Sequence, residues 1–364
     1  MQIDIIAGAR PNFMKIAPII KAIDEVNKNK SLFEYRLIHT GQHYDRNMSD
    51  SFFEQLGIPD PHFNLDVGSG SQAYQTGEIM TRYEKLIVNK PSNLCLVVGD
   101  VNSTMACAIT AKKLNIDVAH VEGGIRSGDR TMPEEINRIV TDSITDYFFT
   151  TSETANSNLL KEGIPDEKIH FVGNTMIDTL LSNINRFRKP EIWDHLRLQS
   201  GGFLVVTLHR PSNVDEETQL SKIIYEIATH SREYPIIFPV HPRTRKNLEK
   251  IGADYSNLHY TEPLSYLEFN YLVKQSKAVI TDSGGITEEA TVMGIPCITL
   301  RNSTERPETC TIGTNKLIGT NPDAIQPVFD TLFNGRWKKG GIPKLWDGKA
   351  ATRIVNVLKN ISKN

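Results

Sequence analysis

Short apolar runs of strand length alternate with helix-like segments through nearly the whole chain, and this alternation constrains the fold more than any other feature. A first series of such runs covers residues 3–7, 35–40, 93–98, 118–121 and 147–150. A second series covers 203–208, 236–240, 259–261, 278–281 and 297–300. Near-continuous apolar strands separated by helices are typical of parallel sheets that helices cover on both faces. The chain is therefore expected to be an α/β protein.

Two such series in 364 residues predict two doubly wound, Rossmann-like domains. We expect an N-terminal domain over 1–173, a C-terminal domain over 174–349, and a final helix at about 350–364 that packs back on the first domain. In such sheets ligands bind beyond the carboxyl ends of the strands. Two domains that face each other would place these strand ends across one cleft.

Charge and composition exclude several classes of partner. Lys+Arg number 41 and Asp+Glu 43, so the net charge of −2 creates no global field for nucleic acid or acidic membranes. No apolar run approaches the ~20 residues of a membrane span. The first residues carry no basic segment of a signal peptide, so we expect a cytoplasmic protein. The four cysteines lack metal-ligand spacing and are interpreted as reduced core thiols, so no metal is expected.

A glycine-rich turn follows the apolar run that ends at Thr281. Ser283, Gly284 and Gly285 lie there between a predicted strand and a predicted helix. Backbone N–H groups at the start of a helix are unpaired, and glycine lets an anion approach the backbone closely. This pattern indicates a phosphate-binding turn, with an ordinary strand-to-helix turn as the alternative.

A second candidate anion site follows the first apolar run. Arg10 and Lys15 flank this strand-to-helix turn, where both side chains can reach a phosphate. Two solvated basic residues are the competing interpretation. The turn is not GxGxxG, so the chain lacks a dinucleotide fingerprint there.

Carboxylates follow two further strands. Asp100 ends one apolar run and Glu122 the next, while Glu134 and Glu135 come directly after Pro133 at the predicted start of a helix. Neighbouring buried carboxylates separate in pKa, so that one can act as general base and another as general acid. The sequence therefore predicts an acid–base site. For Glu134 and Glu135 the alternative role is to stabilise the positive end of the helix dipole.

The second half adds histidine and arginine at predicted strand ends. His209 and Arg210 follow one apolar run, His241 follows another, and Arg306 lies in a charged loop after a third. A histidine at a strand end can contact phosphate or transfer a proton. No GxSxG, Walker, HExxH or CxxC motif occurs. The set fits a protein that handles a nucleotide diphosphate with proton-transfer groups nearby.

These residues occur in strings that resemble the non-hydrolysing UDP-N-acetylglucosamine 2-epimerase family over essentially the whole chain. In the first half the strings are GARP (8–11), HTGQH (39–43), GD (99–100), HVEGGIRSG (120–128) and PEEINR (133–138). In the second half they are GNT (173–175), HR (209–210), PVHP (239–242), TDSGGITEEA (281–290) and TERPE (304–308). The resemblance implies the two-domain glycosyltransferase-B architecture, a homodimer and no cofactor. It implies reversible C2 epimerisation of UDP-N-acetylglucosamine to UDP-N-acetylmannosamine, which supplies precursors for surface polysaccharide.

The resemblance also implies roles for individual residues. Asp100, Glu122 and Glu134 would form the acid–base set, with His209 near the diphosphate and the sugar. The residues implied for substrate binding are Arg10, Lys15, Arg138, Leu264, Phe269, Ser283, Gly284, Gly285, Glu289 and Arg306. Within that set Glu289 would bind the ribose hydroxyls, and Leu264 and Phe269 would flank the uracil.

The implied reaction agrees with the missing dinucleotide motif. The C2 proton of an N-acetylhexosamine has no adjacent carbonyl carbon to acidify it, so inversion requires transient oxidation or elimination of UDP. The first route needs a nicotinamide, which the absence of GxGxxG disfavours. Elimination to a 2-acetamidoglucal needs a stabilised diphosphate and a carboxylate that removes the C2 proton, in a cleft that closes around both products.

Family members are often activated by a second UDP-N-acetylglucosamine, and the sequence matches that allosteric site in part. The matching residues are Gln42, Glu135, Arg210 and His241, whereas segment 68–76 lacks the arginine expected there. Three other functions stay open. The chain could epimerise UDP-2,3-diacetamido-2,3-dideoxy-glucuronic acid, could act as a hydrolysing epimerase or a glycosyltransferase on the same scaffold, or could bind a nucleotide sugar without catalysis.

Overall fold

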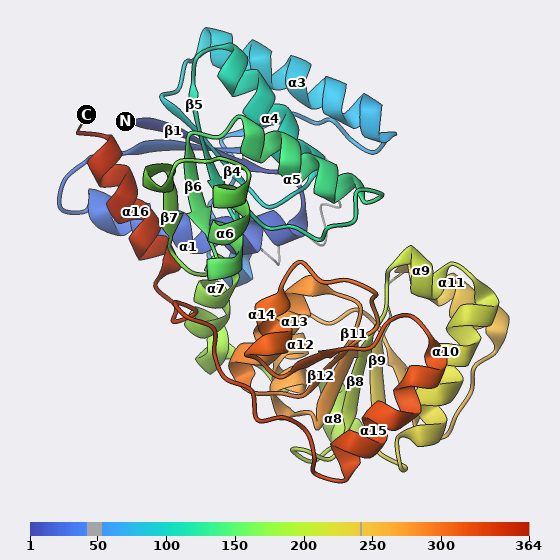
Figure 1. The fold of residues 1–364 in the computed structure, drawn as a ribbon. Helices are drawn as coiled ribbons and strands as arrows, with labels where there is room; N and C mark the ends of the chain where they lie inside the picture. Colours follow the sequence, from blue (N-terminus) through green and yellow to red (C-terminus); the bar gives the residue numbers. More distant parts are fainter. Residues whose placement is uncertain (42–52, 241, 364) are drawn as a thin grey trace. The chain divides into compact units, whose positions relative to one another are not determined.

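The structure, a computed structural model, describes residues 1–41, 53–240 and 242–363 and divides into two compact units. Unit 1 comprises Met1–Ser182 and Lys344–Asn364, and unit 2 comprises Asn183–Pro343. Each unit is built around one parallel sheet with helices on both of its faces (Figure 1). Among the helices of these described ranges, none has the length and apolar character needed to cross a membrane.

The sheet of unit 1 has the strand order β3-β2-β1-β4-β5-β6-β7, and all neighbouring strands are parallel. The strands are β1 (Gln2–Ala7), β2 (Glu34–His39), β3 (Phe63–Asn64), β4 (Leu94–Val98), β5 (Asp117–Val121), β6 (Tyr147–Thr150) and β7 (Ile169–Phe171). The strand order reverses direction between β1 and β4. Doubly wound sheets bind ligands at the carboxyl ends of the strands next to such a reversal.

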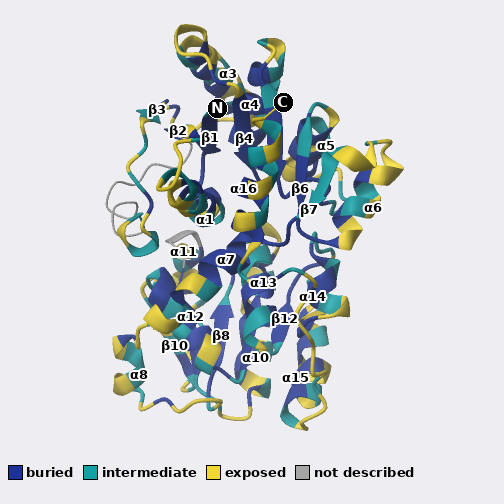
Figure 2. Ribbon diagram, turned by 90° about the vertical axis from the view of Figure 1, so that its left-hand side faces the viewer, coloured by how far each residue is buried: buried dark blue, intermediate teal, exposed yellow. Residues whose placement is uncertain are grey.

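Helices shield this sheet from water on both sides. They are α1 (Arg10–Asn27), α3 (Gln72–Asn89), α4 (Asn102–Lys113), α5 (Pro133–Ser143), α6 (Glu153–Lys161), α7 (Thr175–Asn183) and α16 (Ala350–Ile361). On one face Ile79 and Tyr83 of α3 pack with Cys107 of α4 against Ile6 and Val97 of the sheet. On the other face α1 packs against β1, and α16 packs against α1. This cover explains why β1 and β4 are buried along almost their whole length (Figure 2).

Unit 2 repeats the same plan with six parallel strands in the order β10-β9-β8-β11-β12-β13. Its strands are β8 (Leu204–Thr207), β9 (Ile236–Pro239), β10 (Leu258–Thr261), β11 (Ala278–Thr281), β12 (Cys297–Thr299) and β13 (Asn315–Leu317). Its helices are α8 (Glu191–His195), α9 (Pro211–Val214), α10 (Glu217–His230), α11 (Pro242–Ile251), α12 (Tyr266–Gln275), α13 (Gly284–Met293), α14 (Pro307–Thr311) and α15 (Ile325–Phe333). The order reverses between β8 and β11, so this sheet has its own ligand-binding edge.

The division between the units falls after Ser182, whereas the sequence predicted a boundary after 173. Helix α7 belongs mainly to unit 1, because its side chains bind other parts of that unit. Thr179 Oγ1 donates to the carbonyl of Met14, at 2.5 Å. The carboxylate of Asp178 accepts the backbone N–H groups of Ala350 and Ala351, at 3.1 and 2.7 Å, where α16 begins. Because of these contacts the C-terminal segment returns to unit 1.

The strands expected from the apolar runs are confirmed as β1, β2, β4 to β6 and β8 to β12. Strands β3, β7 and β13 were not predicted; they lie at sheet edges and have only two or three residues each. Edge strands are partly solvated, so β7 and β13 carry polar residues and show no apolar run. The helix expected near 47–56 falls largely outside the described residues.

Candidate functional site

Two of the predicted acid–base residues lie at the ends of adjacent strands in unit 1. Asp100 follows β4 and Glu122 follows β5, and the two strands pair up to Val98 and Val121. The side chain of Glu122 is buried, whereas that of Asp100 is 32% exposed. Lys15 comes from α1, and its Nζ lies 2.6 Å from Glu122 Oε2. The structure therefore brings together both carboxylates and one of the two basic residues that the sequence placed at the first turn.

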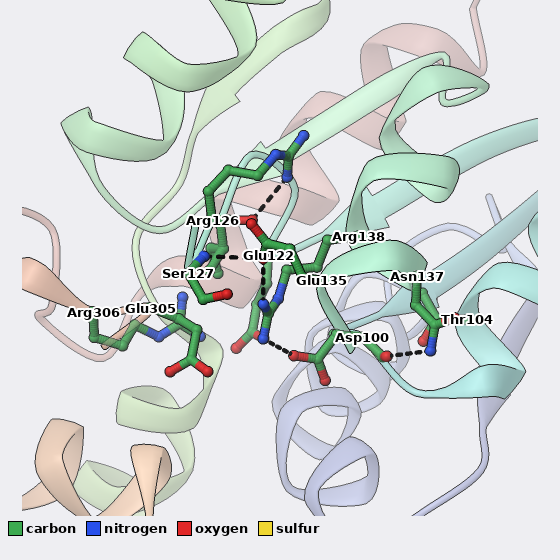
Figure 3. A network of polar contacts seen from close by, with 12 residues as sticks. Asp100, Thr104, Glu122, Arg126, Ser127, Glu135, Asn137, Arg138, Glu305 and Arg306 are labelled. Carbon is green, nitrogen blue, oxygen red and sulfur yellow. Dashed lines mark hydrogen bonds and ion pairs between the residues drawn. The ribbon is translucent and has the colours of Figure 1, made fainter. Parts of the chain in front are cut away.

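Arg138 of α5 forms an ion pair with Asp100 (Figure 3). Arg138 Nη2 lies 2.5 Å from Asp100 Oδ2, and Nη1 lies 2.6 Å from Glu135 Oε2. Glu135 also accepts the backbone N–H groups of Ser127 and Gly128, at 2.9 and 3.0 Å. Burial opposes ionisation of Glu135, but these hydrogen bonds and Arg138 outweigh it and lower its pKa. Glu135 is thus engaged by three donors of unit 1.

Glu134 occupies a different environment from the other two acid–base candidates. Helix α5 begins at Pro133, as predicted, and Glu134 lies exposed in its first turn. Residues four apart share a helix face, so Glu134 lies one turn from Arg138 on the same side of α5. Asn137 Nδ2, between them in sequence, donates to the carbonyl of Asp100 at 2.8 Å. The start of α5 is therefore fixed against the end of β4.

A buried histidine that sequence reasoning passed over connects the turns after β4 and β5. Both ring nitrogens of His120 face acceptors: Nδ1 lies 2.6 Å from Asp142 Oδ1, and Nε2 lies 2.8 Å from the carbonyl of Gly99. A carboxylate and a carbonyl can only accept hydrogen bonds, so the ring links two acceptors that come from different segments. Asp142 also binds Arg126 and the N–H of Gly124. The pair therefore holds Gly99, which precedes Asp100, and Gly124, which lies two residues after Glu122.

Asn12 shapes the turn after β1. Its Oδ1 accepts the N–H groups of Gly8 and Ala9, at 3.1 and 2.9 Å, and its Nδ2 donates to the carbonyl of Val98, at 3.0 Å. These bonds tie the end of β1 to the end of β4 across the point where the strand order reverses. Arg10 lies exposed at the first position of α1.

In unit 2 the structure confirms the strand, glycine-rich turn and helix that were predicted around Ser283. Strand β11 ends at Thr281 and α13 begins at Gly284, with Ser283 at the N-cap position. The Ser283 N–H donates to Thr281 Oγ1 at 3.0 Å, so the turn is closed by the last residue of the strand. Gly284 and Gly285 form the first turn of the helix, where backbone N–H groups have no partner within the helix.

Glu289 is buried one turn further along α13. Tyr266 donates its hydroxyl to Glu289 Oε1 at 2.8 Å. Burial raises the pKa of Glu289 to about 7, although the hydrogen bonds from Tyr266 and Asn270 act in the opposite direction. Leu264 and Phe269 are half-buried and pack on the apolar cluster beneath α12 and α13. The three residues therefore belong to one region of unit 2.

Two buried arginines follow β12. Arg301 forms a double contact with the carboxylate of Glu305, at 2.8 and 2.7 Å. Arg306 forms an ion pair with Glu288 of α13. The predicted residue Arg306 is therefore held next to the glycine-rich turn by α13 itself.

His209 lies 46% exposed after β8, with its Nδ1 2.8 Å from Asp282 Oδ1. Arg210 donates from Nε to the carbonyl of Asp282, at 3.1 Å. Asp282 directly follows the last residue of β11, Thr281, and this position at a strand end could have marked it in the sequence as a candidate site residue.

Gln42 and His241, matched to the allosteric site, lie outside the described residues. Within the described ranges, no group of three or more His, Cys, Asp or Glu residues has an arrangement that could hold a metal ion.

Two doubly wound sheets, each with charged side chains at the carboxyl edge beside the strand-order reversal, define an α/β protein of the nucleotide-binding class. The comparisons with known proteins narrow this class. The profile of the family described as UDP-N-acetylglucosamine 2-epimerase matches residues 24–359. The chain belongs to this family, whose members are isomerases.

Individual relatives match over nearly their full length. The chain is 41% identical to the UDP-N-acetylglucosamine 2-epimerase of Methanocaldococcus jannaschii, covering 98% of this chain and 99% of that protein. It is also 41% identical to the UDP-2,3-diacetamido-2,3-dideoxy-D-glucuronate 2-epimerase of Pseudomonas aeruginosa, covering 99% of this chain and 100% of that protein. A crystal structure of the M. jannaschii enzyme in complex with UDP-GlcNAc and UDP superposes with a TM-score of 0.87 at 40% identity, covering 99% and 100% of the two chains. The predicted fold class, two Rossmann-like units of the glycosyltransferase-B type, is confirmed.

Proposed function

We propose that the chain catalyses reversible C2 epimerisation of UDP-N-acetylglucosamine by elimination and re-addition of UDP through a 2-acetamidoglucal. The observation that carries the proposal is the pair of carboxylates, Asp100 and Glu122, at the ends of two adjacent strands. Elimination and re-addition require one group that removes the C2 proton and another that returns a proton to the opposite face. The M. jannaschii relative, with its bound UDP-GlcNAc and UDP, supports this choice of substrate.

Unit 2 would bind the nucleotide. The start of α13, with Ser283, Gly284 and Gly285, offers backbone N–H groups and the positive end of a helix dipole to the diphosphate. Glu289 would accept hydrogen bonds from the ribose, and Leu264 and Phe269 would flank the uracil. Holding the diphosphate stabilises the charge that develops on UDP as the glycosidic bond breaks.

Unit 1 would supply the acid–base groups. Asp100, Glu122 and the exposed Glu134 are the candidates, and Lys15 and Arg138 balance the charges of the first two. Arg10 lies exposed at the start of α1, where its guanidinium could bind the diphosphate. His209 and Arg306 would contact the sugar diphosphate from unit 2.

We further propose that the protein is a cytoplasmic homodimer that supplies polysaccharide precursors. Gln42, Glu135, Arg210 and His241 would contribute to an allosteric site.

Incubation in deuterated water tests the reaction and its substrate together. Exchange at C2 must accompany epimerisation by this route, because the proton removed from C2 equilibrates with solvent. We expect deuterium at C2 of UDP-N-acetylglucosamine and formation of UDP-N-acetylmannosamine, both followed by NMR. The P. aeruginosa relative makes UDP-2,3-diacetamido-2,3-dideoxy-glucuronic acid the second candidate substrate. Exchange only in that uronate would overturn the choice of UDP-N-acetylglucosamine.

The same NMR experiment separates the reaction from its two rivals on this scaffold. A hydrolysing epimerase would release free N-acetylmannosamine and UDP. A glycosyltransferase would consume the UDP-sugar only after an acceptor is added. The proposed epimerase keeps the sugar attached to UDP at equilibrium, so accumulation of free sugar would contradict the proposal.

Glu289→Gln is expected to weaken UDP binding about tenfold, because the amide loses the charge-assisted hydrogen bonds to the ribose. The pKa of Glu289 is about 7. The ionised carboxylate is the better acceptor, so UDP affinity should rise as pH increases through 7 in the wild type. Since the phosphate of UDP also titrates, the quantity to compare is the ratio of wild-type to variant Kd from pH 6 to pH 8, measured by calorimetry. A constant ratio would remove Glu289 from the ribose site.

A further inference from the structure

Asp282 is buried at the edge of unit 2 where His209 lies, yet the proposed chemistry assigns it no task. Its side chain is 0% exposed, although it directly precedes the glycine-rich turn. Its Oδ1 lies 2.8 Å from His209 Nδ1, whereas the imidazole itself is 46% exposed. A half-exposed ring is therefore held at one nitrogen by a carboxylate that solvent does not reach.

The surroundings of Asp282 fix its position and its charge. Its Oδ2 accepts the N–H of Arg210 at 2.9 Å and Asn213 Nδ2 at 3.1 Å. Both carboxylate oxygens are close to the N–H of His209, at 3.2 and 3.1 Å. Burial opposes ionisation, but His209 and these donors outweigh it and lower the pKa of Asp282. Asn213 Nδ2 also donates to the carbonyl of Leu300, at 3.0 Å, which anchors the group to the end of β12.

An ionised carboxylate can only accept hydrogen bonds, so His209 Nδ1 must carry a hydrogen. The nitrogen left for a ligand is then Nε2. We propose that Asp282 is a positioning residue for His209: it fixes the Nδ1–H tautomer and the ring orientation, and thereby presents Nε2 to the sugar diphosphate. This inference rests on the proposed function, in which His209 contacts that group. A buried aspartate controls a histidine in the same way in serine proteases, on unrelated folds.

Asp282→Asn tests the proposal because asparagine has the same shape. Its amide oxygen can take the place of Oδ2 and still accept from Arg210 and Asn213. Its NH₂ group then replaces Oδ1, 2.8 Å from His209 Nδ1. An NH₂ group can only donate there, so Nδ1 must lose its hydrogen and Nε2 must gain it. The variant keeps the turn and reverses the tautomer.

The first measurement is the ¹⁵N spectrum of the imidazole in protein labelled at histidine, with the His209 signals assigned by their loss in His209→Gln. We expect the neutral ring to be protonated at Nδ1 in the wild type and at Nε2 in Asp282→Asn. The second measurement is epimerisation: kcat should fall about tenfold or more, while KM changes less than about twofold. Glu226→Gln is the matched control. It alters another histidine–carboxylate pair of unit 2, Glu226 with His230 at 3.2 Å on α10, and should leave kcat unchanged.

A double-mutant cycle then tests whether Asp282 acts through His209. In the His209→Gln background, Asp282→Asn should cause no further loss of kcat. Additive losses, an unchanged tautomer or an unchanged kcat would each overturn the inference. Failure of the proposed function gives a different result, because a wild-type protein that epimerises no UDP-sugar would still show the His209 tautomer in its spectrum.

Discussion

Replacing Asp100 by asparagine is expected to lower kcat for C2 epimerisation by about 10²–10⁴-fold, the usual contribution of a general acid or base. The amide has nearly the same shape but cannot take up a proton at neutral pH. Asp100 lies at the end of β4 with its side chain 32% exposed, so it is accessible to a ligand while Arg138 holds one of its oxygens. UDP affinity should remain within about twofold, because Asp100 makes none of the proposed nucleotide contacts, which fall to unit 2 and to Arg10.

Asp117→Asn provides the matched control for this experiment. Asp117 begins β5, with its side chain 50% exposed and 3.9 Å from Lys112, so it sits at the opposite edge of the same sheet. The control should epimerise at the wild-type rate. Asp100→Asn with unaltered turnover would remove Asp100 from the acid–base set, whereas lost turnover with lost UDP binding would indicate a general structural defect.

Asp142→Asn is expected to destabilise unit 1 by about 3–5 kcal/mol, the cost of a buried ion pair that loses one charge. Asp142 and His120 are both about 1% exposed, so solvent cannot replace the carboxylate that faces the His120 ring and the guanidinium of Arg126. Trp346 is the tryptophan of unit 1 and is buried there, whereas Trp193 and Trp337 belong to unit 2. Urea unfolding followed by Trp346 fluorescence, in a protein that also carries Trp193→Phe and Trp337→Phe, reports on unit 1.

The contribution of Asp142 to the free energy of unfolding should decrease at low pH. Burial raises its pKa, but His120, Arg126 and the N–H of Gly124 outweigh burial and lower it below the ordinary value. A carboxyl group with a lowered folded-state pKa stabilises the protein above its unfolded-state pKa of about 3.9, and this contribution is lost as pH falls through the folded-state pKa. The difference between wild type and Asp142→Asn should therefore shrink below about pH 4. Asp117→Asn, at an exposed pair, should cost less than about 1 kcal/mol at any pH. An equally small loss of unfolding free energy in Asp142→Asn would show that the buried Asp142–His120 pair does not stabilise unit 1.

Much of the fold was predictable because helices cover both faces of each sheet. Strands such as β4 and β11 are buried at every position, and a strand with no solvated face appears in sequence as an unbroken apolar run. The edge strands β3, β7 and β13 lack this property, so no local pattern revealed them. No local pattern shows that α7 packs with unit 1, because the contacts of Asp178 and Thr179 join residues far apart in the sequence.

Some residues of the candidate site could likewise be predicted from local sequence, whereas others could not. Asp100, Glu122 and the turn at Ser283 were predicted as site residues because each lies within two residues of a strand end, and parallel strands end at the same sheet edge. What the sequence alone determined was therefore the fold class and the positions that reach that edge. Only the tertiary structure showed that Asp142 and Asp282 are buried against His120 and His209. Such pairs join residues distant in sequence, and their chemistry follows from burial and from which nitrogen faces a carboxylate, which no local pattern encodes.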